Sequence, residues 1–165
     1  EEEDPSVEHP IISAVISDTS ESKLTVTGVP DRPGIAARLF RGLADRSVNV
    51  DMIEQNVSSR GTTDISFTVP NEDLSVAIEV ASLLAPEIGA TDVLADRDVA
   101  SVSLIGAGMK THPGVSATMF EVLASEGINI EMISTSAIRI TCVVREALAD
   151  NAVVALHQAF KLEAE

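Results

Sequence analysis

The chain carries one turn, helix and strand twice, and an internal repeat of this kind rules out most folds. A Pro-Gly turn at Pro33–Gly34 is followed by apolar residues at helical spacing and then by Asn49–Ser58. The same order recurs from Pro113–Gly114 to Asn129–Ser136, in constant register through helix and strand. A Pro-Gly pair alone indicates only a turn. Its repetition with the same helix and the same Asn-apolar-acid-Met-Ile strand predicts two homologous modules.

The first module is expected to be an α+β unit with the ferredoxin-like order β-α-β-β-α-β. Its first helix is expected from Ile35, with Asp31 as the capping residue. The second lies between Pro70 and Gly89, and Pro86 and Gly89 are expected to close it. Alternating and β-branched runs predict its four strands at 23–28, 48–57, 62–69 and 91–94.

The second module lacks a fourth strand of its own. Its pattern predicts strands at 100–105, 128–134 and 137–144 and helices at 115–125 and 146–160. An apolar run at Pro10–Ser17 precedes the first module, and an unpaired sheet edge is a liability. We therefore expect this run to complete the second module, so that residues 19–97 form the first module inserted within 98–165 plus 10–18. The alternative is a disordered leader.

Composition excludes several classes of function. The formal net charge of −15 argues against nucleic-acid partners, which require clusters of Lys and Arg. An RNA-binding sheet would also need aromatic residues, which make up only 2% of this chain.

No apolar run is long enough to span a membrane, and no signal peptide is apparent. The single cysteine, Cys142, excludes an internal disulfide and agrees with a cytoplasmic location; we expect a buried, inert thiol.

Nothing in the sequence indicates catalysis, a cofactor or a metal. The histidines His9, His112 and His157 are scattered and lack metal-ligand spacing. No phosphate-binding glycine loop and no paired nucleophile and base are present. For His112, in the second Pro-Gly turn, we expect an effector contact or a structural role in the turn, and not a role as general base.

The Pro-Gly turns are suited to binding a small zwitterion. Each leads directly into a helix, whose first N–H groups and dipole favour a carboxylate. Nearby carboxylates, those of Asp31, Asp51 and Glu131, could receive an ammonium group. A free amino acid carries both groups. The alternative, equally weighted from spacing alone, is that Asp31 only caps a helix and Asp51 is a solvated surface residue.

The repeated motif resembles the paired ACT domains of aspartokinases. The resemblance rests on Val26–Ala36, Asn49–Ser58 and Thr62–Phe67 in the first copy, and on Val102–Met109, His112–Val115 and Asn129–Ser136 in the second. The chain is most similar to the type of bacterial aspartokinase that lysine and threonine inhibit in concert. In that type the regulatory region can be a separate subunit. The kinase domain is absent from this chain, so the resemblance implies a non-catalytic regulatory part.

The resemblance also implies partners and sites. It implies a homodimer through ACT domains, a catalytic aspartate kinase subunit, and threonine, lysine or both as feedback effectors, without a cofactor. Effectors would bind where modules meet, one turn facing the strand of the other module. The implied effector-binding residues are Asp31, Pro33, Gly34, Ile35, Ala36, Asn49, Val50, Asp51, Gln55, Ser58, Thr63, Asp64, Met109, Thr111, His112, Gly114, Val115, Asn129, Ile130, Glu131, Thr135 and Ser136. An ACT-type amino-acid sensor for a different metabolic enzyme is the alternative.

Overall fold

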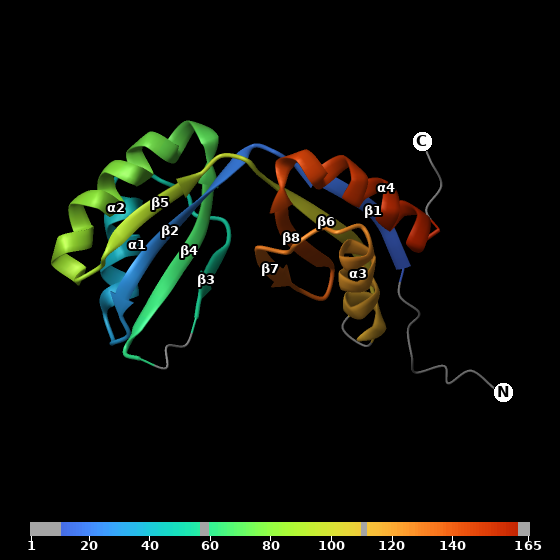
Figure 1. Cartoon of the computed structure of the whole chain (residues 1–165), viewed down its shortest axis with the longest axis horizontal. Helices are drawn as coiled ribbons and strands as arrows, with labels where there is room; N and C mark the ends of the chain where they lie inside the picture. The colour runs from blue at the N-terminus through green and yellow to red at the C-terminus, as the bar shows by residue number, and fades with distance from the viewer. Residues whose placement is uncertain (1–10, 57–59, 110–111, 162–165) are drawn as a thin grey trace. The chain divides into compact units, whose positions relative to one another are not determined.

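The computed structural model describes residues 11–56, 60–109 and 112–161, which form two units (Figure 1). One unit is Ser20–Asp98, and the other joins the chain before Ser20 to the chain from Val99 onward. Each unit is a four-stranded antiparallel sheet with two helices. The predicted fold class, two ferredoxin-like βαββαβ modules with the first inserted in the second, is confirmed. The unit boundaries lie one residue beyond the expected ones.

The inserted unit has the sheet order β3-β4-β2-β5. Strand β2 lies in the middle and pairs with both β4 and β5. The two crossing helices connect strands that are not sheet neighbours, as the ferredoxin-like order requires. Its elements are β2 (Glu21–Pro30), α1 (Ile35–Asp45), β3 (Ile53–Gln55), β4 (Thr62–Pro70), the 3-10 turn η1 (Asn71–Asp73), α2 (Leu74–Ile88) and β5 (Asp92–Asp96).

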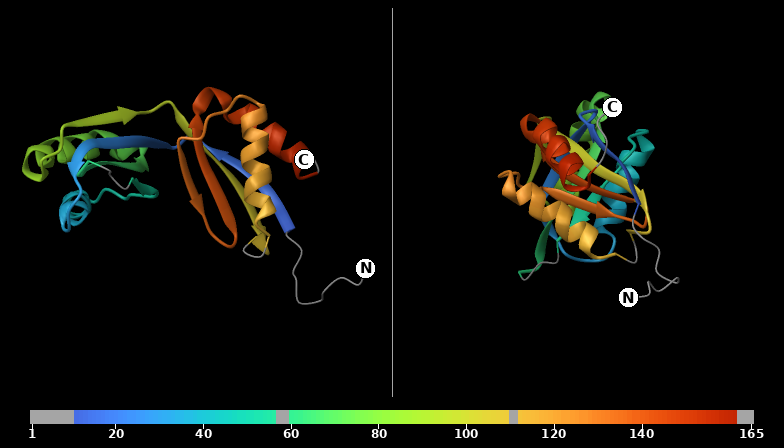
Figure 2. Two further views of the ribbon diagram at one scale, coloured as in Figure 1. Left: turned by 60° about the horizontal axis from the view of Figure 1, so that its bottom comes forward. Right: turned by 90° about the vertical axis from the view of Figure 1, so that its right-hand side faces the viewer.

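The second unit has the equivalent order β1-β6-β8-β7, with β1 in the place that β5 has in the first. Strand β1 runs antiparallel to β6, with Val15 opposite Leu104 and Asp18 opposite Ser101. The two strands lie side by side in Figures 1 and 2, so the expected N-terminal replacement strand is confirmed. The elements are β1 (Ile11–Asp18), β6 (Val99–Ala107), α3 (Gly114–Ser125), β7 (Met132–Thr135), β8 (Arg139–Arg145), the 3-10 turn η3 (Glu146–Leu148) and α4 (Ala149–Ala159).

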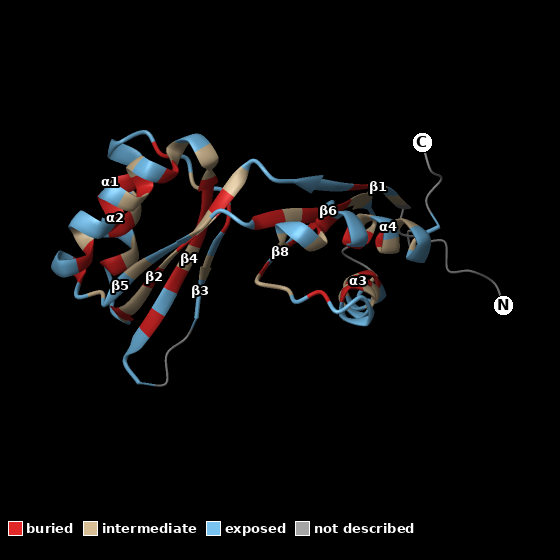
Figure 3. Ribbon diagram, turned by 45° about the horizontal axis from the view of Figure 1, so that its top comes forward, coloured by how far each residue is buried: buried red, intermediate tan, exposed pale blue. Residues whose placement is uncertain are grey.

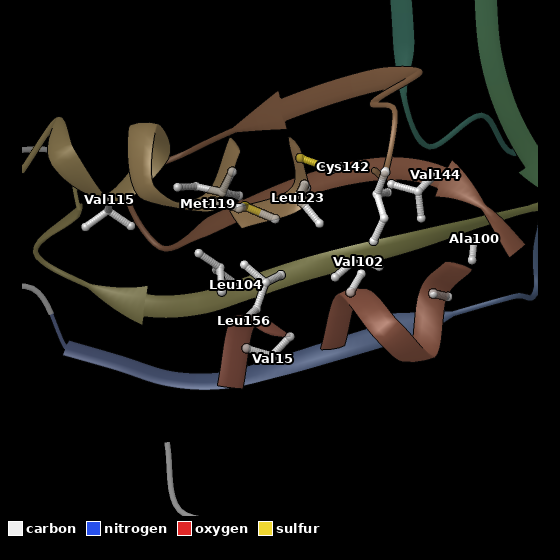
Figure 4. Packing of buried hydrophobic residues seen from close by; sticks show 14 of the residues in the cluster. Val15, Ala100, Val102, Leu104, Val115, Met119, Leu123, Cys142, Val144 and Leu156 are labelled. Atoms are coloured by element: carbon white, nitrogen blue, oxygen red, sulfur yellow. The ribbon is translucent and has the colours of Figure 1, made fainter. Parts of the chain in front are cut away.

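Each unit has its own apolar core between the helices and one face of the sheet. Alternate residues of the strands face the helices, as the period of two in a strand dictates, and Figure 3 shows these buried positions along β4. In the inserted unit, Ile35, Leu39 and Leu43 form the buried side of α1. The corresponding core of the second unit includes Met119 and Leu156, which Figure 4 shows beside the sheet.

The strands that return after α1 and α3 are shorter than predicted. Regular pairing starts only at Ile53 in β3, not at residue 48, and only at Met132 in β7, not at residue 128. In the first unit, the bonds between Met52 and Thr68 explain the late start of β3. The Met52 N–H donates to the Thr68 hydroxyl (3.0 Å), while the Thr68 N–H donates to the Met52 carbonyl (3.0 Å). A side-chain hydroxyl thus takes the place of a backbone carbonyl as acceptor, and the residues just before β3 do not form a regular ladder.

Two residues lack the roles predicted for them at helix ends, Asp31 as a cap and Pro86 as a terminator. Helix α1 starts at Ile35, as predicted, but its N-cap residue is Gly34, whose φ is 92°, and no side chain caps the helix. Asp31 instead donates its backbone N–H to the Gly61 carbonyl (2.9 Å), so it belongs to the preceding turn and not to the helix cap. Pro86 does not close α2 but lies inside its last turn, and the helix ends at the left-handed Gly89.

Among the described residues, no helix has the combined length and apolarity that crossing a bilayer would demand.

Cys142 is expected to resist alkylation in the folded protein. The side chain is fully buried in β8, and burial raises the pKa of its thiol to about 12. Because the thiolate is the reactive form, iodoacetamide at pH 8 should label native protein at least a hundredfold more slowly than protein unfolded in urea. The thiol also titrates at lower pH in the unfolded chain. Its contribution to stability is therefore complete below about pH 9 and is lost as the pH rises toward 12. Mass spectrometry of the labelled protein measures the rates, and equal rates would contradict the buried position.

Candidate functional site

The first Pro-Gly turn leaves the start of α1 open. The first helical bond runs from the Arg38 N–H to the Gly34 carbonyl (3.0 Å), so the preceding N–H groups have no intrahelical acceptor. No side chain caps them, and a Cβ on Gly34 would meet nothing within 4 Å. The carboxylate of Asp31 has no partner among the described residues. Open donors beside a free carboxylate match the two charges of a zwitterion.

The second Pro-Gly turn also leads directly into a helix, but its glycine has a different backbone conformation. Helix α3 starts at Gly114 after Pro113, which has no N–H to donate. The His112 carbonyl accepts the Val115 N–H (3.1 Å), and the His112 N–H donates to the Met109 carbonyl (3.2 Å). A Cβ on Gly114 would meet nothing within 4 Å, and Gly114 is not in the left-handed region that makes substitution of Gly34 a strain on the backbone.

Two hollows flank the start of α3. The larger, about 500 Å³, lies between the turn and the β7–β8 hairpin. It brings together the predicted Met109, Thr135 and Ser136 with Pro113, Ser116, Ala137 and Ile140. The smaller, about 330 Å³, is lined by the predicted His112, Gly114 and Val115 together with Pro113, Thr118 and Phe160. The sequence provided no signal for Phe160, because it reaches the turn only through the packing of the C-terminal helix.

The carboxylates that precede β3 and β7 occupy equivalent positions. The Asp51 N–H donates to the Thr68 carbonyl (3.1 Å), and the Glu131 N–H donates to the Val143 carbonyl (2.8 Å). The side chain of Asp51 is exposed and has no partner among the described residues. Glu131, in contrast, accepts two bonds from Arg145, from Nε and Nη2, each 2.7 Å long. The two copies therefore differ at the carboxylate.

Three of the predicted residues hold turns in place. The Thr63 hydroxyl donates to the Asn56 carbonyl, and the Asp64 carboxylate accepts the Gly28 N–H (3.1 Å). In the second unit the Ser136 hydroxyl accepts the Arg139 N–H (3.1 Å) and closes the β7–β8 hairpin. These bonds fix the loops next to the helix starts. Asp64 in particular is already engaged by the backbone.

The other predicted residues divide by exposure. Ile35 and Val115 are buried core residues, and Val50 and Ile130 pack at the edges of the two cores. The exposed ones are Pro33, Asn49, Gln55 and Asn129, and Ala36 is half-buried. Ser58 and Thr111 lie outside the described residues. Among those described, no group of three or more His, Cys, Asp or Glu side chains could hold a metal ion.

Comparison with known proteins decides the family. The model of the ACT domain matches twice, at residues 24–82 and 102–160, which is one match for each unit. The chain belongs to the ACT domain family. The predicted resemblance to the regulatory region of aspartokinases is confirmed by the relatives and solved structures described next.

Curated relatives of this ACT chain include aspartokinases. It is 51% identical over 161 residues to the aspartokinase of Mycobacterium tuberculosis (strain ATCC 25618 / H37Rv) and 50% identical over 165 residues to that of Corynebacterium glutamicum. These matches cover 96% and 99% of this chain but only 38% and 39% of the relatives. The chain thus spans well under half the length of the aspartokinases it resembles.

Two solved structures match over nearly their full length. The first is a chain from the crystal structure of aspartokinase alpha and beta subunits, with a TM-score of 0.87 and 42% identity, covering 92% of this chain and all of that one. The second is the ligand-free regulatory subunit of aspartate kinase from Thermus thermophilus, with a TM-score of 0.86 and 39% identity, covering 90% of this chain and 98% of that one. The present chain is therefore similar in extent to a regulatory subunit.

Proposed function

We propose that this chain is the regulatory part of an aspartate kinase and binds threonine, lysine or both for feedback inhibition of aspartate-family amino-acid biosynthesis. The observation that carries the proposal is the match to a regulatory subunit of aspartate kinase over 98% of that subunit. The proposed setting is cytoplasmic, with no cofactor. The proposed partners are a second copy of the chain and a catalytic aspartate kinase chain.

The open helix starts support an amino acid as the ligand. Its carboxylate would bind the N–H groups at the start of α1 or α3, where the helix dipole favours an anion. Its ammonium group would bind a carboxylate such as Asp31 or Asp51, both without a partner among the described residues. In this proposal a facing ACT unit, of the same chain or of a second copy, completes each half-site through Asn49–Asp51 or Asn129–Glu131.

Regulation requires that the ligand prefer one arrangement of the assembly over another. A ligand held by two ACT units stabilises the arrangement in which both halves of its site are present. The catalytic chain would then be held in its less active state. In the reconstituted kinase, threonine or lysine should lower the rate of aspartate phosphorylation. Recovery of a different enzyme as the partner would instead favour the sensor alternative.

Isothermal titration calorimetry with threonine and with lysine tests the binding. We expect saturable heat from at least one of them. Ala37→Asp in α1 and Gly114→Asp in α3 should each weaken binding at the altered turn by about tenfold or more, because the new carboxylate repels that of the ligand. Neither site has a left-handed backbone that would strain the substitution.

The matched control is Ala124→Asp, an exposed residue near the other end of α3. It adds the same charge roughly 15 Å along the helix and should leave the affinity unchanged within about twofold. Folded protein that gives no heat with either amino acid would overturn the proposed function. Equal loss in Gly114→Asp and Ala124→Asp would overturn the assignment of the ligand carboxylate to the N–H groups at the start of α3.

A further inference from the structure

The carboxylate of Glu131 forms an ion pair with Arg145 of the same unit. Both Nε and Nη2 of Arg145 bond to it, one to each carboxylate oxygen, at 2.7 Å. The Glu131 side chain is only 18% exposed, whereas that of Arg145 is 39% exposed, so the carboxylate is the more buried partner. Parallel bonds of this kind are the strongest geometry between a guanidinium and a carboxylate. An incoming ammonium group would have to compete with Arg145 for this carboxylate.

Among the described residues of the inserted unit, no arginine pairs with Asp51 in this way. The position of Arg145 follows from sheet register: Arg145 lies opposite Val99 at the start of β6, as Pro70 lies opposite Glu21 at the start of β2. Pro70 therefore occupies the corresponding place, and it has no charge to offer to Asp51. Of the two equivalent carboxylates, that of Glu131 is therefore paired with an arginine, and that of Asp51 has no partner among the described residues.

We propose that Arg145 is a specificity-determining residue, which neutralises Glu131 and so disfavours a ligand with a basic side chain at the half-site Asn129–Glu131. This inference rests on the proposed function, which places a ligand against that strand. With Arg145 present, the half-site has no net charge and suits an amino acid whose side chain is uncharged. Without it, the Glu131 carboxylate would lose both bonds from Arg145, and a second ammonium group on the ligand could supply the missing charge.

The test is the ratio of the affinities for lysine and threonine, measured by calorimetry on the whole chain. Arg145→Gln should raise the affinity for lysine relative to threonine by about tenfold or more, the effect of one hydrogen bond to a charged group. Glu131→Gln should shift the ratio in the opposite direction, because it leaves the cation of Arg145 without its carboxylate. The double substitution restores a neutral pair, and the ratio should return to within about threefold of the wild type.

The opposite shifts distinguish this role from a structural one. A merely structural pair would lower the affinity for both amino acids together in either variant and would leave their ratio unchanged, which would overturn the inference. Glu131→Gln removes the carboxylate charge itself, so it gives a result even where Arg145→Gln fails to fold, as judged by circular dichroism. Wild-type protein that binds neither amino acid would overturn the proposed function and this inference with it, whereas wild-type binding with an unchanged ratio overturns the inference alone.

Discussion

Val15→Asp is expected to unfold the unit that contains β1. Val15 is buried opposite Leu104 and belongs to the core between the sheet and the helices α3 and α4. The substitution loses about 1.5–3 kcal/mol of apolar burial. It also places a carboxylate among apolar side chains, which costs several kcal/mol more. The sum approaches the whole stability of a typical small domain, about 5–15 kcal/mol.

Urea unfolding followed by far-ultraviolet circular dichroism is the measurement, since the chain has no Trp or Tyr for fluorescence. Ile16→Asp is the matched control, because Ile16 lies on the opposite face of the same strand and is 43% exposed. It should cost less than about 1 kcal/mol. Equal destabilisation by the two variants would mean that β1 does not present Val15 to the core.

Phe67→Ala is expected to destabilise the inserted unit by about 3–5 kcal/mol, the range for removing a buried phenylalanine. Phe67 is fully buried in β4, and its ring stands edge-on to that of Phe40, with 5.4 Å between the centroids and 76° between the planes. The substitution would leave a cavity between β4 and α1 and break this aromatic pair. The midpoint of urea unfolding reports the loss.

Phe40→Ala is the comparison for this prediction. Phe40 makes the same aromatic contact but is only partly buried, so its removal should cost less, about 1–2 kcal/mol. A cost for Phe40→Ala equal to that for Phe67→Ala would show that the aromatic contact, and not burial, sets the stability of this core.

The two cores are filled differently in spite of the repeat. Phe67 lies opposite Leu24, and the residue in the same register of the second unit is Cys142, opposite Val102. A repeat in sequence therefore conserves the path of the backbone, which depends on period and turn residues. The volumes of individual side chains are free to differ where neighbours compensate.

Several features of this protein follow from the sequence alone. The repeat, the alternation of apolar residues and the Pro-Gly turns predict the order of helices and strands, since these signals are local and have periods of two or 3.6 residues. The missing fourth strand of the second module predicts that the N-terminal run completes its sheet, and β1 pairs with β6 as expected. Here the sequence is sufficient because an incomplete sheet accepts only a strand with a matching pattern.

Other features depend on which side chains the fold brings together. The sequence assigns Asp51 and Glu131 the same role, yet only Glu131 meets a guanidinium, because sheet register places Arg145 beside it and Pro70 at the corresponding place in the other unit. Tertiary structure likewise turns Asp64 toward the Gly28 N–H. Local patterns determine the backbone path, whereas the charge of a site depends on contacts between residues far apart in the chain, and these exist only once the strands are in register.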